Sequence, residues 1–94
     1  MNEKTIEKKV CDYAKAQGCL VYKFTSPSNR GVPDRMILAP EGHLLFIEFK
    51  QPGGRLSALQ KYHIEMIGSM GFSVEVVDDV VCGKALIDAW RDAV

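Results

Sequence analysis

Two acidic residues and a lysine in a very apolar part of the chain form the pattern most suggestive of chemistry. Asp34 begins one apolar run, and Glu48 and Lys50 close the next one. Charged side chains among Leu, Phe and Ile are costly to bury unless they are paired or functional. Two carboxylates beside a lysine suit Mg²⁺ or Mn²⁺ and a phosphate better than Zn²⁺, which prefers His and Cys ligands.

The two apolar runs are expected to form a β-hairpin that brings the two acids together. If the strand ends pair across a three-residue loop, Asp34 lies directly opposite Glu48, with Cβ atoms about 4.5–5.5 Å apart. A bulge at Gly42 would shift this register by one residue. Alternation along the second strand puts Glu48 and Lys50 on one face. A shared cation is one interpretation, and a cross-strand salt bridge between Lys50 and one acid is the other.

The spacing of apolar and turn-forming residues predicts one small α/β domain over residues 1–94, with the element order αβββαβα. The residues expected to face inward are Leu59, His63, Met66 or Ile67, and Met70 in the second helix. In the last helix they are Val81, Ala85, Leu86, Ala89 and Trp90. The predicted elements are a helix over Glu3–Gln17, a strand over Cys19–Thr25, a loop over 26–33, strands over Asp34–Ala39 and His43–Lys50, a helix around Leu59–Met70, a strand over Phe72–Val77, and a helix that begins at Asp78 or Asp79.

The composition excludes several classes of protein. The chain has 94 residues, with twelve Lys and Arg against twelve Asp and Glu, and 47% hydrophobic residues. These values exclude a disordered tail, a collagen-like chain and a strongly basic nucleic-acid coat. No apolar run approaches the ~20 residues of a membrane span, and Lys8 and Lys9 interrupt the place of a signal peptide's apolar stretch. We therefore expect a cytoplasmic (intracellular) protein with three free cysteines.

Three short motifs, in order, resemble those of a known nuclease group. Pro33-Asp34 followed by Glu48-Phe49-Lys50 resembles the signature of the PD-(D/E)xK nuclease superfamily. Together with Gly31-Val32 before it and Leu56-Ser57-Ala58-Leu59-Gln60 after it, the pattern resembles the VRR-NUC family over about Glu7 to Val77. The resemblance implies a PD-(D/E)xK nuclease-like α/β fold, with a mixed central sheet flanked by helices.

The resemblance also implies roles for the acids and the lysine. Asp34 and Glu48 would be metal ligands, and the main-chain carbonyl of Phe49 would supply a third oxygen. Lys50 would orient or help to deprotonate the attacking water, or stabilise charge that develops on the phosphate. Because Lys50 carries a positive charge, stabilisation of charge is the role that we favour.

Two further residues have both a functional and a structural interpretation. Glu7 matches the acid that the family supplies from its first helix, as a catalytic residue or a further metal ligand. It is otherwise a solvent-facing residue favoured by the helix dipole. Gln60 would face the active site in the resemblance, but it also completes a capping box with Ser57. These two roles compete for one side chain, and we place Glu7 and Gln60 among the catalytic candidates.

The function implied is that of a Mg²⁺- or Mn²⁺-dependent DNA endonuclease, a homodimer that prefers branched or Holliday-junction-like DNA. Candidate DNA-binding residues are Lys23, Arg30, Arg35 and Arg55. The alternatives are a catalytically silent nuclease-fold module that binds DNA or protein, and an unrelated α/β domain. Zero net charge is compatible with DNA binding, because residues 1–71 hold ten Lys and Arg against seven acids.

Overall fold

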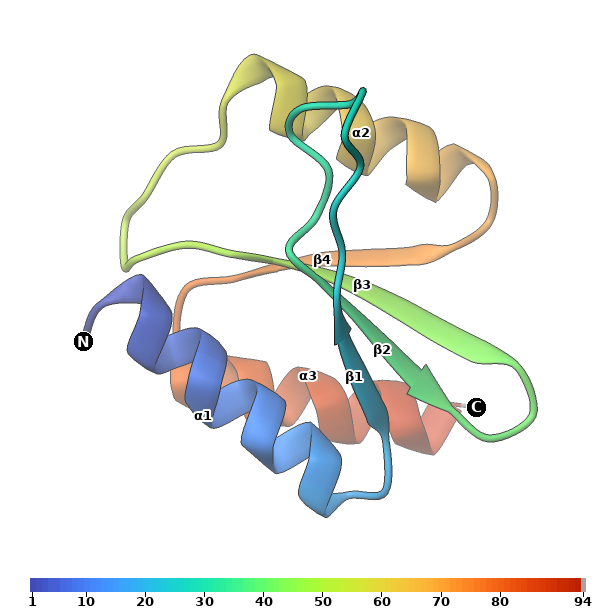
Figure 1. Cartoon of the computed structure of the whole chain (residues 1–94). Coiled ribbons are helices and arrows are strands. Elements are labelled where there is room, and N and C mark those ends of the chain that lie inside the picture. The colour runs from blue at the N-terminus through green and yellow to red at the C-terminus, as the bar shows by residue number, and fades with distance from the viewer. Residues whose placement is uncertain (94) are drawn as a thin grey trace.

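The computed structural model describes residues 1–93, which form a mixed four-stranded sheet with helices on both faces (Figure 1). The predicted α/β class and the order αβββαβα are confirmed. No helix within residues 1–93 is long and apolar enough to cross a membrane. The elements are α1 (Glu3–Ala16), β1 (Leu20–Lys23), β2 (Arg35–Ala39), β3 (His43–Phe49), α2 (Ala58–Ser69), β4 (Ser73–Val77) and α3 (Val80–Ala93).

Local sequence signals define where the first two helices begin. Helix α1 starts after Asn2, whose side chain accepts a hydrogen bond from the Thr5 N–H at 2.9 Å. Helix α2 starts after Ser57, which forms a capping box with Gln60. Such caps satisfy backbone N–H groups that have no partner within the helix. They fix the position of α2, whose first turn contributes to the site described below.

The sheet has the strand order β1-β2-β3-β4, and only the β3–β4 pair is parallel. In the β2–β3 hairpin, Ala39 pairs with His43 and Arg35 pairs with Ile47. This is the predicted register, and one further step along it sets Asp34 opposite Glu48. The three-residue connection absorbs the reversal without a slip, because Glu41 and Gly42 have φ angles of 72° and 80°.

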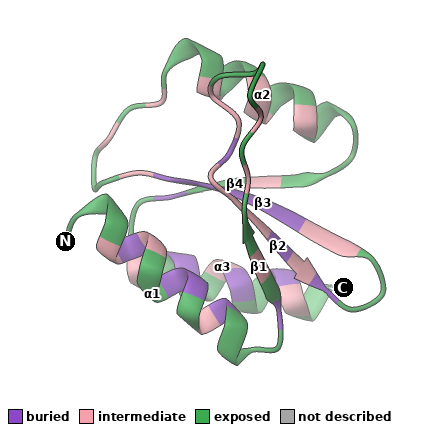
Figure 2. Ribbon diagram, in the orientation of Figure 1, coloured by how far each residue is buried: buried purple, intermediate pink, exposed green. Residues whose placement is uncertain are grey.

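The main hydrophobic core lies between the sheet and helices α1 and α3, as the buried segments in Figure 2 show. Strand β3 sends Leu45, Ile47 and Phe49 into this core. Because successive strand residues point to opposite faces, Phe46 and Glu48 point to the face that α2 partly covers. The acid of the chemical pattern is therefore on the opposite face from the main core.

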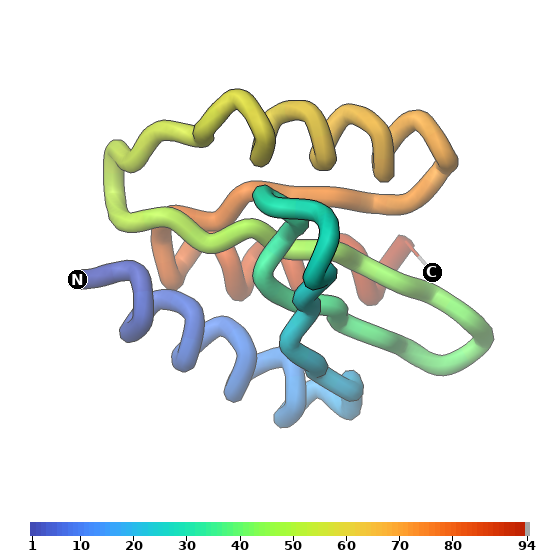
Figure 3. The backbone as a smooth tube through the Cα atoms, turned by 45° about the horizontal axis from the view of Figure 1, so that its top comes forward, coloured from blue at the N-terminus to red at the C-terminus, as the bar shows by residue number. Residues whose placement is uncertain are grey.

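Helix α2 lies above β4 on the other side of the sheet from α1 and α3 (Figure 3). None of its residues is buried. The prediction for this helix is half right, because His63 and Ile67 are half-buried, but Met70 is 70% exposed and Leu59 and Met66 are also exposed. The half-buried residues of α2 are Gln60, His63, Ile64 and Ile67. This stripe, which contains Ile64 and Ile67, faces the sheet.

In α3 the prediction is half right. Trp90 is buried and Leu86 is half-buried, but Val81 is 75% exposed and Ala85 and Ala89 are exposed. Gly83 and Ile87 are the other buried positions. Periodicity missed Gly83 because a glycine carries no hydrophobic signal. The absence of a side chain at Gly83 allows α3 to approach α1 closely.

Replacing Gly83 with Ala is expected to destabilise the protein by about 1–3 kcal/mol, because overpacking a filled core costs that much. A Cβ atom at this position would lie 2.6 Å from Val10 Cγ2 and 2.9 Å from Val77 Cγ1. Urea unfolding would measure the loss. Gly68→Ala in α2 is the matched control, because its Cβ would meet nothing within 4 Å and alanine favours helix. Equal effects of the two substitutions would contradict this account of the α1–α3 contact.

Candidate active site

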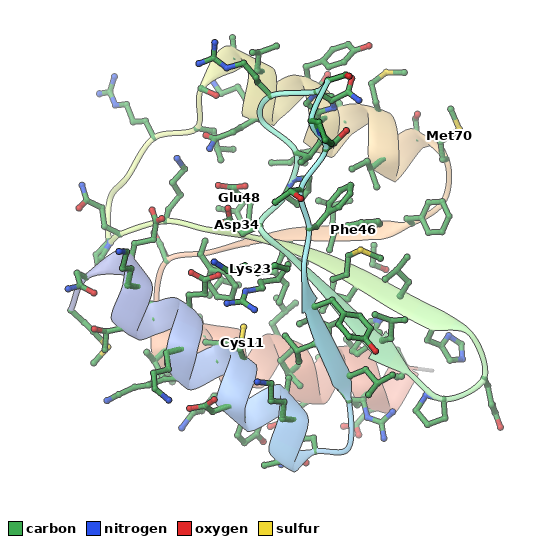
Figure 4. The ribbon with its side chains drawn as sticks, in the orientation of Figure 1. Cys11, Lys23, Asp34, Phe46, Glu48 and Met70 are labelled. Atoms are coloured by element: carbon green, nitrogen blue, oxygen red, sulfur yellow. The ribbon has the colours of Figure 1, made fainter. Side chains whose placement is uncertain are left out.

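The two acids meet where the hairpin strands end under α2 (Figure 4). Asp34 lies just before β2, and its Oδ2 accepts a hydrogen bond from the Phe49 N–H at 2.8 Å. Glu48 is the one buried charged residue within residues 1–93, at 3% exposure. The hydrogen bond to Phe49 ties Asp34 to the strand that carries Glu48. The backbone thus holds the two carboxyl groups side by side.

Burial raises the pKa values of both acids, and the charge of Asp34 raises that of Glu48 further. For Glu48, burial and then the charge of Asp34 raise the pKa to about 8, while nearby Lys50 lowers it. For Asp34, burial raises the pKa, against the hydrogen bond from Phe49. Two adjacent carboxyl groups cannot both ionise easily without a positive charge between them. Perturbed acids in such a pair are typical of functional sites.

Without metal, the protein is expected to lose stability as the pH rises from about 5 to about 8. In the unfolded chain Glu48 ionises near its ordinary pKa of 4.5, but in the folded chain it holds its proton to about 8. The folded state therefore binds more protons in this window, and the free energy of unfolding falls as pH rises. Urea unfolding in EDTA at both pH values measures the fall. Glu48→Gln should show a smaller one, and an unchanged fall in that variant would contradict the assignment.

Gln60 links the acidic pair to the first turn of α2. Its Oε1 accepts a hydrogen bond from the Ser57 N–H at 2.8 Å, and its Nε2 donates one to Glu48 Oε2 at 3.1 Å. The expected competition between capping and the site is therefore wrong, because the two ends of one carboxamide do both. The capping box thus presents the side-chain N–H group of Gln60 to Glu48.

The loop before β2 packs closely against the start of α2 through Gly31 and Pro33. Gly31 has a φ of 88°, and a Cβ there would lie 2.8 Å from the backbone carbon of Leu59 and 3.0 Å from the Gln60 nitrogen. Only glycine lets the loop approach the start of α2 this closely. Pro33 is fully buried. The loop therefore anchors both Asp34, which follows it, and the helix turn that holds Gln60.

Lys50 and Phe49 lie directly after Glu48 on β3. The main-chain N–H of Lys50 donates to the Val77 carbonyl at 2.9 Å, which extends the pairing with β4. The Lys50 side chain is half-buried and forms no ion pair within residues 1–93, although its charge reaches both acids. The Phe49 side chain is fully buried in the core, which fixes the main chain beside the acidic pair.

Glu7 faces inward from α1 but pairs with Arg35. The Arg35 Nε donates to Glu7 Oε2 at 2.6 Å, and both side chains are mostly buried. The charge of Glu7 still raises the pKa of Asp34, so the pair lies near the site. Arg35 is therefore mostly buried and paired with Glu7, whereas an arginine that binds DNA is expected to be exposed. Sequence spacing alone missed it, because the two residues are 28 positions apart.

The other candidate DNA-binding residues are exposed and lie on separate segments. Lys23 ends β1 next to Arg35, and Arg55 lies in the segment before α2. Arg30 lines a depression with Gly31 and the first turn of α2, next to Gln60.

A mixed sheet flanked by helices, with an Asp opposite a Glu-Phe-Lys segment at the hairpin ends, defines a domain of the PD-(D/E)xK nuclease class. The model of the family described as "VRR-NUC domain" matches residues 6–80, close to the predicted span. The chain belongs to the VRR-NUC family.

Relatives of known sequence and structure agree with this membership. The chain is 36% identical over 78 residues to "Putative nuclease p44" of Acyrthosiphon pisum secondary endosymbiont phage 1, covering 83% of this chain and 84% of that protein. A solved VRR_NUC domain superposes with a TM-score of 0.85 at 26% identity, over 92% of this chain and 94% of its own. A VRR_NUC domain protein shares the fold with a TM-score of 0.80 at 20% identity, over 98% and 89%.

Proposed function

We propose that this chain is a divalent-metal-dependent DNA endonuclease with Asp34 and Glu48 as its metal ligands. One observation carries the proposal: Glu48, nearly inaccessible to solvent, is held against Asp34 by the sheet and contacted on one oxygen by Gln60. A protein rarely buries two adjacent carboxyl groups without a compensating charge. The family membership supports nuclease chemistry as the reason for this arrangement.

The donor set fits Mg²⁺ or Mn²⁺. Within residues 1–93, no group of three or more His, Cys, Asp or Glu side chains gathers around one point, so the protein would offer two carboxylates. Mg²⁺ is commonly bound by one or two carboxylates together with water and substrate phosphates. The main-chain carbonyl of Phe49 is our candidate for a third protein ligand. When bound, the cation supplies Lewis-acid polarisation of the phosphate and makes water a better nucleophile at neutral pH.

The remaining residues act on charge and position in this proposal. Lys50 stabilises negative charge that develops on the phosphate, because its side chain has no ion-pair partner of its own within residues 1–93. Gln60 keeps one Glu48 oxygen oriented. Glu7, paired with Arg35, adds negative charge beside Asp34 and is a catalytic residue or further ligand when that pair opens.

The DNA substrate would lie across the open side of the acidic pair. Lys23, Arg30 and Arg55 are exposed around it and would contact phosphates, which position the backbone without reading sequence. We propose that residues 1–94 act as one nuclease domain, inside the cell, on branched or junction DNA. Because one copy offers few phosphate contacts, we propose a homodimer as the active unit.

Cleavage of labelled DNA tests the proposal. Four-way junction, flap, single-stranded and duplex DNA would be incubated with the protein in Mg²⁺, in Mn²⁺ and in EDTA. We expect cutting with either metal, none in EDTA, and the highest rate on the junction. Cutting that persists in EDTA would overturn the metal mechanism. Binding without cleavage in every divalent cation would instead identify a catalytically silent nuclease-fold module.

A further inference from the structure

The ion pair between Arg35 and Glu7 joins helix α1 to the strand end that carries Asp34. Arg35 follows Asp34 directly and stands opposite Ile47, a core residue of β3, in the hairpin register. Because opposed residues of paired strands point to the same face of a sheet, the Arg35 side chain leaves the sheet toward α1. It meets Glu7 there, and the two side chains are only 20% and 19% exposed.

Glu7 compensates the charge of this mostly buried arginine. An arginine does not lose its proton in proteins, so a guanidinium that is largely removed from water needs an anionic partner. Burial opposes the charge of Arg35, but the hydrogen bond with Glu7 and neighbouring negative charges, that of Asp34 included, raise its pKa. The contact joins Arg35 Nε to Glu7 Oε2, whereas the strongest arginine–carboxylate pairs use two parallel N–H groups.

The charge of Glu7 acts on the acidic pair as well as on Arg35. After burial, which raises the pKa of Asp34 most, the charge of Glu7 raises it further. The Glu7 carboxylate is therefore within electrostatic reach of the position proposed for the cation. At equal distance a divalent cation attracts a carboxylate about twice as strongly as a guanidinium does, because the Coulomb energy is proportional to the charge. Arg35 and a cation at Asp34 would thus compete for one carboxylate.

We propose that Arg35 is a positioning residue that restrains Glu7 and thereby lowers the affinity of the protein for its divalent cation. Arg35 holds Glu7 Oε2 by a hydrogen bond and places a positive charge next to Asp34 in the chain. Release of Glu7 toward the acidic pair would add a third carboxylate to the donor set. The inference rests on the proposed function, because it needs the cation that Asp34 and Glu48 are proposed to hold.

Titration calorimetry of Mn²⁺ into variants of the metal-free full chain tests the restraint. Arg35→Met removes the charge and the hydrogen bond, so it should lower the Mn²⁺ dissociation constant by at least about 10-fold, because the donor set gains a carboxylate. In the Glu7→Gln background the same substitution should lower it by no more than about threefold, which is the effect of removing a partly screened repulsion alone. A gain of equal size in both backgrounds would overturn the restraint.

Lys8→Met is the matched control for the loss of a paired cation. Lys8 pairs with Asp12 on the same helix at 2.7 Å, but the two side chains are 76% and 54% exposed. Because water screens such a pair, its loss should leave the dissociation constant for Mn²⁺ within about twofold of normal. A purely structural role of Arg35 would leave the affinity unchanged or reduce it.

Arg35→Gln keeps the test available if Arg35→Met fails to fold. Glutamine retains an N–H donor for Glu7 but removes the charge, and a neutral hydrogen bond is weaker than a charge-assisted one. We expect Mn²⁺ to bind this variant at least about threefold more tightly than the unaltered protein, since the restraint on Glu7 is weaker. Unchanged or weaker binding by folded Arg35→Gln would overturn the inference.

The outcomes separate this inference from the proposed function. If the unaltered protein cleaves DNA with Mn²⁺ but Arg35→Met binds Mn²⁺ no more tightly, the restraint is overturned and the nuclease proposal stands. If the gain in affinity requires Glu7 but no variant cleaves any DNA substrate, the restraint stands and the nuclease proposal is overturned. Mn²⁺ binding that Asp34→Asn leaves unchanged would place the cation elsewhere and overturn both.

Discussion

Replacing Glu48 with Gln is expected to reduce Mg²⁺-dependent DNA cleavage by about 10³-fold or more. The substitution keeps the shape of the side chain and an oxygen that can accept from Gln60 Nε2. It removes the negative charge that the cation requires, and electrostatic stabilisation of this kind is among the largest contributions to catalysis. Initial rates on the junction substrate, with matched protein concentrations, measure the loss.

Glu41→Gln is the control for this substitution. Glu41 is an exposed acid in the turn of the same hairpin, so its replacement removes one negative charge without touching the site. Its rate should match that of the unaltered protein within about twofold. Near-normal cleavage by Glu48→Gln would contradict the role given to the acidic pair. The variant should also be more stable than the parent in EDTA near pH 8, which shows that lost activity is not lost folding.

Replacing Lys50 with Ala is expected to lower cleavage by about 10²–10³-fold while Mn²⁺ binding stays within a few-fold of normal. The lysine acts on the phosphate rather than on the cation in our account, so rate and metal affinity should separate. Removing a positive charge beside two acids also raises the proton affinity of Glu48. The pH at which the rate rises should therefore move upward in the variant.

Lys50→Arg and Lys9→Ala complete this test. Arginine keeps the charge but changes its geometry, so it should restore part of the rate and lower the pH shift. Lys9 is an exposed lysine of α1, and its loss should change nothing measurable. A Lys50→Ala enzyme that loses rate only because it no longer binds Mn²⁺ would assign the lysine to metal-site assembly instead.

Sequence reasoning predicted the hairpin register because two independent signals agreed. A three-residue connection with Gly42 sets the pairing of the strand ends, and strand alternation places Glu48 on one face. Both depend on residues within about fifteen positions of one another. The opposition of Asp34 and Glu48 followed from this local geometry, and the structure has the same register.

Features that depend on distant contacts could not be predicted in this way. The Glu7–Arg35 pair and the contact of Gly31 with α2 join segments that only the tertiary fold brings together. Met66 and Met70 of α2 were mispredicted as core residues, because methionines at helical spacing usually indicate a core. Both are exposed, and the stripe of Gln60, His63, Ile64 and Ile67 faces the sheet instead.

Titration calorimetry of Mn²⁺ into the metal-free protein tests the central claim most directly. The claim is that Asp34 and Glu48 together hold the cation that makes this family member a nuclease. We predict saturable binding by the unaltered protein and by Glu41→Gln, and no measurable binding by Asp34→Asn. Binding of Mn²⁺ by folded Asp34→Asn with the affinity of the unaltered protein would contradict the claim.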